Sequence, residues 1–128
     1  MGTTHFSNLS AATITATTGF VGDATGNLTG LALQGGSETA IAADGAIPIT
    51  TLASLLDSSG GALAMTLADG VAGQMKFIKC DTAGNNAVVT PANLEEGSTL
   101  TFDAADEVAL LVFLGTNWHI IYNTATLA

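Results

Sequence analysis

Glu107–Tyr122, with the sequence EVALLVFLGTNWHIIY, is the most hydrophobic stretch of the chain. Its two apolar runs, Val108–Leu114 and Trp118–Tyr122, are joined by Gly115-Thr116-Asn117, which offers a glycine for a positive φ. Such a pattern is typical of a β-hairpin. The first run is apolar at every position, so we expect both of its faces to be covered. One face would meet the domain core, and the other a second sheet, the N-terminal segment or another subunit.

Side-chain alternation predicts which residues of two strands share a face, because successive side chains of a strand point to opposite sides. In the second run of the hairpin, Trp118, Ile120 and Tyr122 are expected on one face and His119 with Ile121 on the other. In the stretch Gln74–Cys80, Met75 and Phe77 are expected on one face and Lys76, Ile78 and Cys80 on the other.

From Glu38 onward, short apolar stretches alternate with turns. Besides the hairpin, extended structure is expected at Thr39–Ala42, Ala46–Thr51, Ala62–Leu67, Gln74–Cys80, Ala87–Thr90 and Thr99–Phe102. Leu52–Asp57 fits a strand or one helical turn, and we favour the strand. Asp69-Gly70-Val71-Ala72-Gly73 is expected to be a hairpin turn. This spacing predicts an all-β fold, a compact β-sandwich or barrel of about 7–9 short strands.

Residues 1–36 differ from the rest and predict an extended Gly/Thr-rich N-terminal arm ahead of a compact β domain at residues 37–128. Asp23-Ala24-Thr25-Gly26 and Asn27-Leu28-Thr29-Gly30 are two copies of a four-residue unit. Such a unit becomes stable when copies stack or several chains wind together. The alternative is a flexible linker. Apolar residues nevertheless recur along the segment, as expected of an arm that docks on a surface.

The charge balance argues against two classes of partner. The chain has eleven Asp and Glu residues, two Lys and no Arg, which gives a net charge of −9. Nucleic-acid binding and binding to an anionic membrane both need clustered cations, which Lys76 and Lys79 do not supply. Val108–Leu114 is too short to cross a bilayer as a helix. Since 48% of residues are hydrophobic and only 10% charged, we expect much of the surface to lie in protein contacts.

The residue inventory predicts no enzyme, no cofactor and no metal site. Catalysis needs a nucleophile, a base and an orienting partner brought together, and the histidines are His5, near the terminus, and His119, within a strand. Cys80 follows an apolar strand and is expected to be an inert buried thiol. The acidic turns around Glu95 and Asp103 do not match a calcium-loop pattern and are expected to be solvated. The start of the chain lacks the pattern of a secretory signal peptide.

Two stretches resemble virion proteins of tailed bacteriophages. Gly19–Gly30, GFVGDATGNLTG, resembles the G-D-x-T-G-N-x-T-G repeats of trimeric phage fibres and head-attached proteins. Thr66–Lys76, continuing through Ala87–Pro91 to the Trp118 hairpin, is similar to a compact β domain of phage capsid decoration and fibre proteins. The resemblance covers most of the chain. Fibres carry many tandem repeats and this chain barely two, which favours a compact decoration protein.

The resemblance implies a capsid decoration (cement) protein on the outer capsid surface of the virion, made in the host cytoplasm. It would be a homotrimer that stabilises the shell of the phage major capsid protein, with the arm on the shell and the hairpin in the trimer core. The residues expected to make these contacts are Ile14, Phe20, Val21, Leu28, Leu31, Leu111 and Phe113. The alternative is a trimeric fibre or baseplate-associated protein that binds host surface glycans, with Trp118 and Tyr122 as the candidate aromatic platform.

Overall fold

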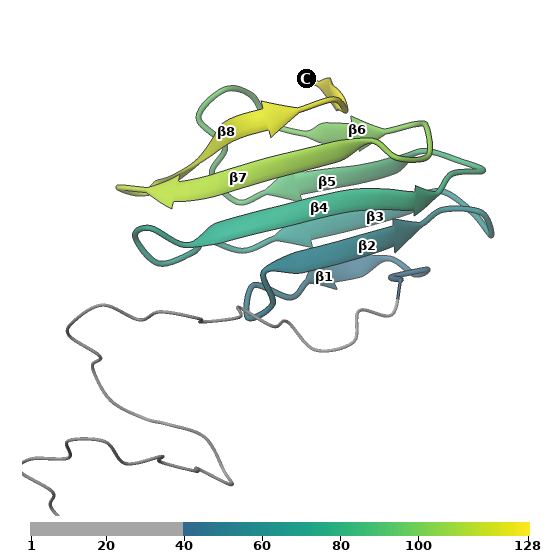
Figure 1. Ribbon diagram of the computed structural model, residues 1–128, viewed down its shortest axis with the longest axis horizontal. Coiled ribbons are helices and arrows are strands. Elements are labelled where there is room, and N and C mark those ends of the chain that lie inside the picture. The colour runs from purple at the N-terminus through teal and green to yellow at the C-terminus, as the bar shows by residue number, and fades with distance from the viewer. Residues whose placement is uncertain (1–39) are drawn as a thin grey trace, which may run out of the picture. The chain divides into compact units, whose positions relative to one another are not determined.

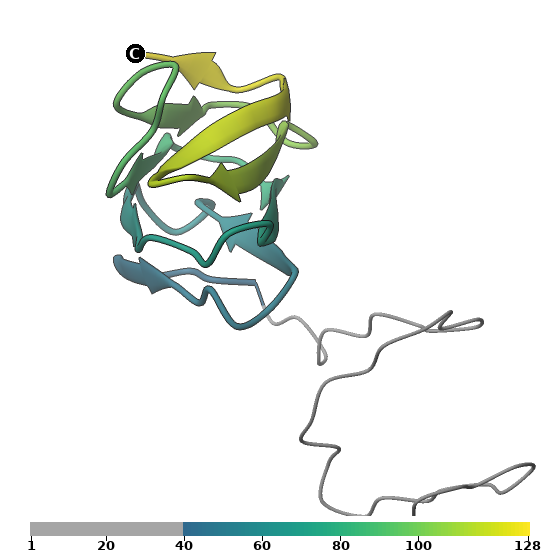
Figure 2. The ribbon, with the colours of Figure 1, turned by 90° about the vertical axis from the view of Figure 1, so that its left-hand side faces the viewer.

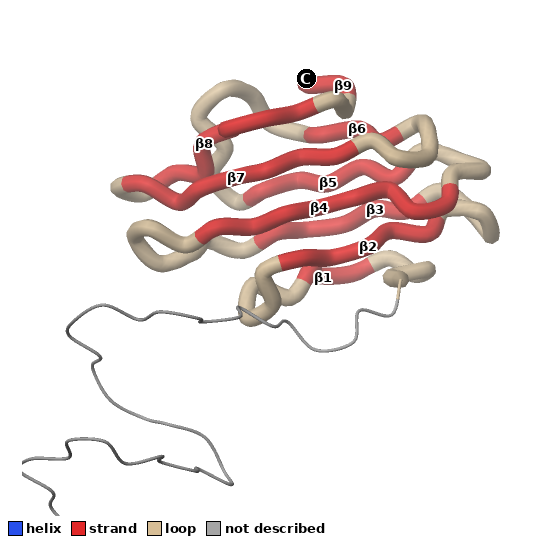
Figure 3. The backbone as a smooth tube through the Cα atoms, in the orientation of Figure 1, coloured by secondary structure: helices blue, strands red, loops and turns tan. Residues whose placement is uncertain are grey.

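A computed structural model describes residues 40–128, and these residues confirm the all-β expectation. They contain no helix and form nine strands arranged in two mixed sheets, a β-sandwich (Figures 1 and 3). The strands are β1 (Gly45–Ile47), β2 (Ala53–Asp57), β3 (Leu63–Leu67), β4 (Met75–Thr82), β5 (Ala87–Pro91), β6 (Leu100–Phe102), β7 (Val108–Leu114), β8 (Asn117–Asn123) and β9 (Thr126–Leu127). The expected arm, residues 1–36, lies outside the described residues.

The first five strands alternate between the two sheets (Figure 2). One sheet has the order β1-β3-β5-β6-β9 and the other β2-β4-β7-β8. Each of the first strands therefore pairs in parallel with the second strand after it, β1 with β3, β3 with β5 and β2 with β4. The chain winds as two coils of a parallel solenoid before antiparallel strands complete both sheets.

This winding corrects the expectation of a hairpin turn at Asp69–Gly73. β3 and β4, on either side of that loop, belong to different sheets, so the loop carries the chain across the sandwich. Local turn chemistry indicates where a strand ends but not which strand it pairs with. The same turn residues occur in hairpins and in crossovers between sheets. The structure also assigns Ala53–Asp57 to a strand, and adds β9, which the sequence pattern did not indicate.

The hairpin at the end of the chain is formed by β7 and β8, as predicted. The turn is shorter than expected, since Asn117 already pairs with Leu114. Gly115 has a φ of 64°, in the left-handed region that glycine tolerates. The strand pairing slips by one residue between Leu110 and Leu111, because Leu110 lies opposite Tyr122 and Leu111 opposite Ile120. Ile121 is the extra residue of this β-bulge.

The core lies between the two sheets and is filled by alternating strand residues. Its buried hydrophobic residues include Ile47, Leu56, Met65, Leu67, Ile78, Val89, Leu100, Phe102, Leu111 and Trp118. Each sheet therefore presents one face to the core and one face outward.

Candidate interaction surface

The outward face of the sheet β2-β4-β7-β8 is apolar. Strand register places on it the residues that alternate with the core residues of the same strands. Phe77 lies beside Ala53 of β2 and opposite Leu110 of β7, while Met75 lies opposite Val112. We define the outer apolar face as Leu55, Met75, Phe77, Leu110, Val112 and Tyr122.

These side chains retain exposed area, although water is an unfavourable environment for them. Met75 is 46% exposed and Tyr122 57% exposed, and Leu55, Phe77, Leu110 and Val112 are partly exposed. Leu114 and Ile121, at the rim, are exposed as well. Scattered apolar residues are ordinary on a protein surface, but a contiguous apolar face marks an interaction site.

Two polar side chains share this face by register: Lys79, between Leu55 of β2 and Val108 of β7, and His119, opposite Val112. The other charged residues of the four strands are Lys76, which points into the core, and Asp57 and Asp81 toward the strand ends. Lys79 Nζ lies 2.8 Å from Asp106 Oδ1 and 3.7 Å from Asp81 Oδ1. Its hydrogen bond to Asp106 raises the pKa of Lys79. Lys79 is thus paired with acids of its own chain.

Both edges of the same sheet are covered by backbone of the same chain. At the β2 edge, Ile41 N donates to Leu55 O, and Asp57 N donates to Ile41 O, both at 2.9 Å. At the β8 edge, Trp118 N donates to Asn93 O at 2.8 Å and Glu95 N donates to Trp118 O at 3.0 Å. The Glu96 carboxylate accepts a hydrogen bond from Ile120 N, the next amide along this edge. These bonds hinder strand addition at both edges, because the amides and carbonyls that they use already have partners.

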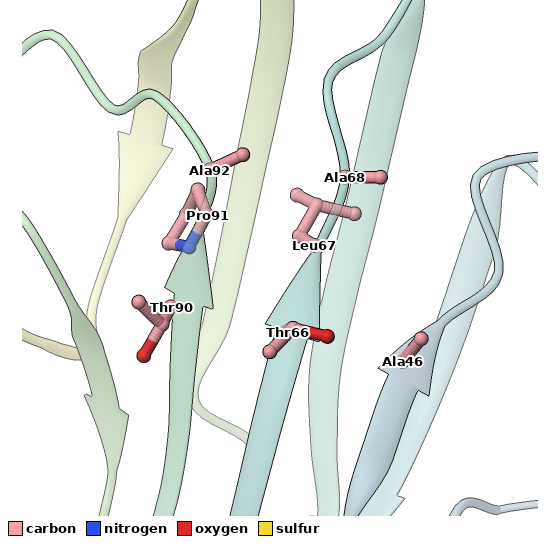
Figure 4. Close-up of a pocket in the computed structure, with 7 residues that line it drawn as sticks. All are labelled: Ala46, Thr66, Leu67, Ala68, Thr90, Pro91 and Ala92. Atoms are coloured by element: carbon pink, nitrogen blue, oxygen red, sulfur yellow. The ribbon is translucent and has the colours of Figure 1, made fainter.

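The outward face of the other sheet is different in chemistry. Ala46 pairs with Thr66, Thr66 with Thr90, and Ala64 with Val88, so small and hydroxyl-bearing side chains cover it. At the carboxyl ends of β1, β3 and β5 there is an open hollow of about 320 Å³ (Figure 4). It is lined by Ala46, Thr66, Leu67, Ala68, Thr90, Pro91 and Ala92. None of these side chains is ionisable, so the hollow supplies no acid, base or metal ligand.

Lys76 is the unusual residue of the interior. Its side chain is fully buried, and its Nζ donates to Pro48 O at 2.8 Å, Thr51 O at 2.9 Å and Ser54 Oγ at 2.8 Å. The ammonium group also lies 3.0 Å from Thr51 Oγ1. Oxygen atoms of the segment between β1 and β2, and of β2 itself, thus replace its hydration shell. Lys76 is therefore a structural clamp, a residue that holds the segment between β1 and β2 against β4.

The structure places the predicted contact residues in two groups. Leu111 and Phe113 lie inside the domain core, at 0% and 5% exposure, and the Phe113 ring packs edge-on against Trp118 with centroids 5.2 Å apart. Their neighbours Leu110 and Val112 face outward. The remaining predicted contacts, Ile14, Phe20, Val21, Leu28 and Leu31, lie outside the described residues. Alternation along β7 divides its residues between two faces. Because both faces are apolar, the sequence does not indicate which of them is exposed.

The expectation that Tyr122 shares the face of Trp118 is wrong. Trp118 is fully buried and its Nε1 donates to Ala68 O at 3.0 Å, whereas Tyr122 is largely exposed. The bulge at Ile121 adds one residue between them, which reverses the side to which Tyr122 points. The candidate aromatic pair for glycan binding is therefore divided between core and surface.

The candidate reactive residues do not converge. Cys80 is fully buried at the end of β4, where its amide donates to Glu107 O, beside the start of β7. His119 pairs with Val112 near the other end of β7, and its Nδ1 lies 3.5 Å from Glu96 Oε1. Burial raises the pKa of the Cys80 thiol, which keeps it protonated and unreactive at neutral pH.

In the acidic turn before β7, a carboxylate accepts hydrogen bonds from backbone amides of the same turn. Glu107 Oε2 accepts from Asp103 N at 2.6 Å and from Ala104 N at 3.1 Å. Among residues 40–128, no group of three or more His, Cys, Asp or Glu side chains is placed to hold a metal ion. In the same range no helix is long and apolar enough to cross a membrane.

No family model, curated protein or solved structure matches this chain.

Proposed function

We propose that this protein is a structural virion protein, a capsid decoration protein that binds the outer surface of a phage capsid as a trimer and stabilises its shell. The observation that carries the proposal is the outer apolar face, a surface suited to protein contacts on a domain of otherwise low charge. The resemblance of Gly19–Gly30 to virion repeats supports the capsid as the setting.

The architecture suits a structural role more than a chemical one. A sandwich whose two sheets share a continuous core resists local opening, because its central strands are both hydrogen-bonded and packed. The reactive side chains that are described serve the fold: Lys76 holds the β1–β2 segment and Cys80 fills core volume. Residues 1–36 remain the proposed capsid-binding arm, with strand addition as its expected mode of contact.

Binding to capsids tests the proposal directly. Purified full-length protein is incubated with expanded phage capsids that lack their decoration protein, and bound protein is quantified after sedimentation. We expect saturable binding at a fixed number of copies per capsid and a higher temperature of capsid disruption. Unchanged thermal stability together with no particle labelling would contradict the proposal.

The fibre alternative keeps one supporting observation, the exposed ring of Tyr122. Trp118 is buried, so a stacking platform for a sugar would rest on that single ring and its apolar neighbours. Glycan-array binding that is lost in Tyr122→Ala, with label at the tail of the virion, would favour this alternative over decoration.

A further inference from the structure

We propose that the outer apolar face is the surface through which the copies of the proposed trimer associate, with the occupant of each face being the same face of the other two copies. The inference deepens the proposed function, on which it rests for its requirement of several copies per particle. It replaces Leu111 and Phe113, which are core residues, by Leu110, Val112 and their neighbours as the residues in contact.

The first argument is the cost of leaving the face in water. Leu55, Met75, Phe77, Leu110, Val112 and Tyr122 form one surface across four adjacent strands. Burying apolar area is favourable by about 25 cal/mol per Å². Stacking one sheet on another, at about 10 Å, is the standard way in which a flat apolar sheet face is covered.

The second argument concerns the direction of approach. Ile41 covers part of the β2 edge and residues 93–96 cover part of the β8 edge, which hinders a partner from extending this sheet sideways. The face itself is open to contact. Contact through a sheet face is made by side chains and not by backbone hydrogen bonds. Large apolar side chains, which are suited to such contact, are concentrated on this face.

The third argument identifies the partner by charge. In residues 40–128 the acids lie in loops or at strand ends: Asp44, Asp57, Asp69, Asp81, Glu95, Glu96, Asp103, Asp106 and Glu107. A basic partner would be attracted to those ends and not to the middle of the face. Copies whose outer apolar faces meet around one axis bury apolar groups of the same kind and keep their acids at the periphery, where water screens repulsion.

The size of the face sets the expected strength. Four strands at about 4.8 Å and seven residues at about 3.3 Å give a footprint on the order of 400 Å² per copy. A standard stable interface uses about 800 Å² per partner. The face by itself therefore supports reversible association that depends on protein concentration.

The test compares two valine substitutions in the full-length protein. Val112→Asp places a carboxylate in the outer apolar face, on β7 between β4 and β8. Val88→Asp places the same group on the outward face of the other sheet, on β5 between β3 and β6. Both valines are partly exposed and lie in internal strands, so the strand-propensity cost is matched. Circular dichroism and urea unfolding report folding, and sedimentation velocity over a hundredfold concentration range reports mass.

We expect the wild type and Val88→Asp to associate with the same constant, and Val112→Asp to weaken association at least about a hundredfold while staying folded, because a buried unpaired carboxylate is costly. Should Val112→Asp unfold, Met75→Asp at the rim of the face is measured in its place. Equal loss in both valine variants would overturn the inference. A wild type that stays monomeric would also overturn it, and protection of Tyr122 from carbene labelling in that monomer would assign the face to residues 1–39. Capsid binding is measured separately, so loss of capsid binding by an associated protein counts against the decoration role alone.

Discussion

Lys76 shows how a single charged side chain can be part of a core. Its ammonium group is held by carbonyl and hydroxyl oxygens of residues 48–54, and it ties the segment between β1 and β2 to β4. A lysine in an apolar core is costly unless its donors are all used. Here the chain supplies the acceptors from one short segment.

We expect Lys76→Met to destabilise the domain by about 2–4 kcal/mol. Methionine replaces the apolar part of the lysine side chain but lacks the ammonium group, so buried oxygens are left unsatisfied, at a cost of about 1–3 kcal/mol each. Urea unfolding at neutral pH measures the change. Lys79→Met is the control, since Lys79 makes solvent-exposed ion pairs, and its loss of stability should be much smaller. Equal stability of Lys76→Met and the wild type would show that Lys76 is not a clamp.

Cys80 leads to a pH-dependent prediction. Burial raises its pKa above the ordinary value of 9.0, so the folded state keeps the thiol protonated where the unfolded state releases the proton. Stability should therefore be unaffected by this group below about pH 9 and should fall as pH rises above it. Unfolding free energies between pH 8 and pH 10 should decline more steeply for the wild type than for Cys80→Ala. Parallel slopes would contradict this prediction.

The β7–β8 turn depends on Gly115. Its φ of 64° lies in a region that costs an L-residue about 1–2 kcal/mol, although an added Cβ would meet nothing within 4 Å. We expect Gly115→Ala to lower the free energy of unfolding by about 1 kcal/mol. Gly60→Ala is the matched control, because a Cβ there also meets nothing within 4 Å and its φ is not in that region. Equal effects of the two substitutions would rule out a conformational cause.

The two faces of β7 can be separated by adjacent leucines. Leu111 is fully buried in the core, and Leu110 is partly exposed on the outer apolar face. We expect Leu111→Asp to abolish folding, since it buries a carboxylate without a partner. Leu110→Asp should fold and lose association. Circular dichroism together with sedimentation distinguishes these results, and a folded, associated Leu111→Asp protein would contradict the assignment of the core.

At the scale of the whole molecule, association should appear as added stability. A partner that binds only the folded state raises its thermal midpoint in proportion to the logarithm of partner concentration. We expect the midpoint of the wild type to rise by a few degrees over a hundredfold increase in protein concentration. The midpoint of Val112→Asp should stay constant over the same range. Calorimetry measures both, and a constant midpoint for the wild type would leave the outer apolar face without a partner copy.

The way in which the domain is wound also belongs to this scale. Ala53 lies beside Phe77, and Gly45 beside Met65, so neighbours in each sheet come from distant parts of the chain. Contacts of this kind require closure of long loops before they are formed. Nothing in the local pattern around Asp69 distinguishes such a crossover from a hairpin.

The sequence by itself determined the all-β class, the position of most strands and the β7–β8 hairpin. It also determined that Lys76 shares a face with Ile78 and Cys80. These properties are local, because turn residues and the alternation of side chains act over a few neighbours. The pattern of β7 did not indicate which of its two apolar faces is exposed.

Only the tertiary structure decided which face is the core. Alternation alone would allow Met75 and Phe77 to be inside and Lys76 outside. In the structure Lys76 is inside, because oxygen atoms of residues 48–54 accept its hydrogen bonds. These residues lie more than twenty positions away in the sequence. The bulge at Ile121 turned Tyr122 outward for a similar reason, since register depends on the partner strand as well as on the strand itself. The outer apolar face follows from these non-local pairings.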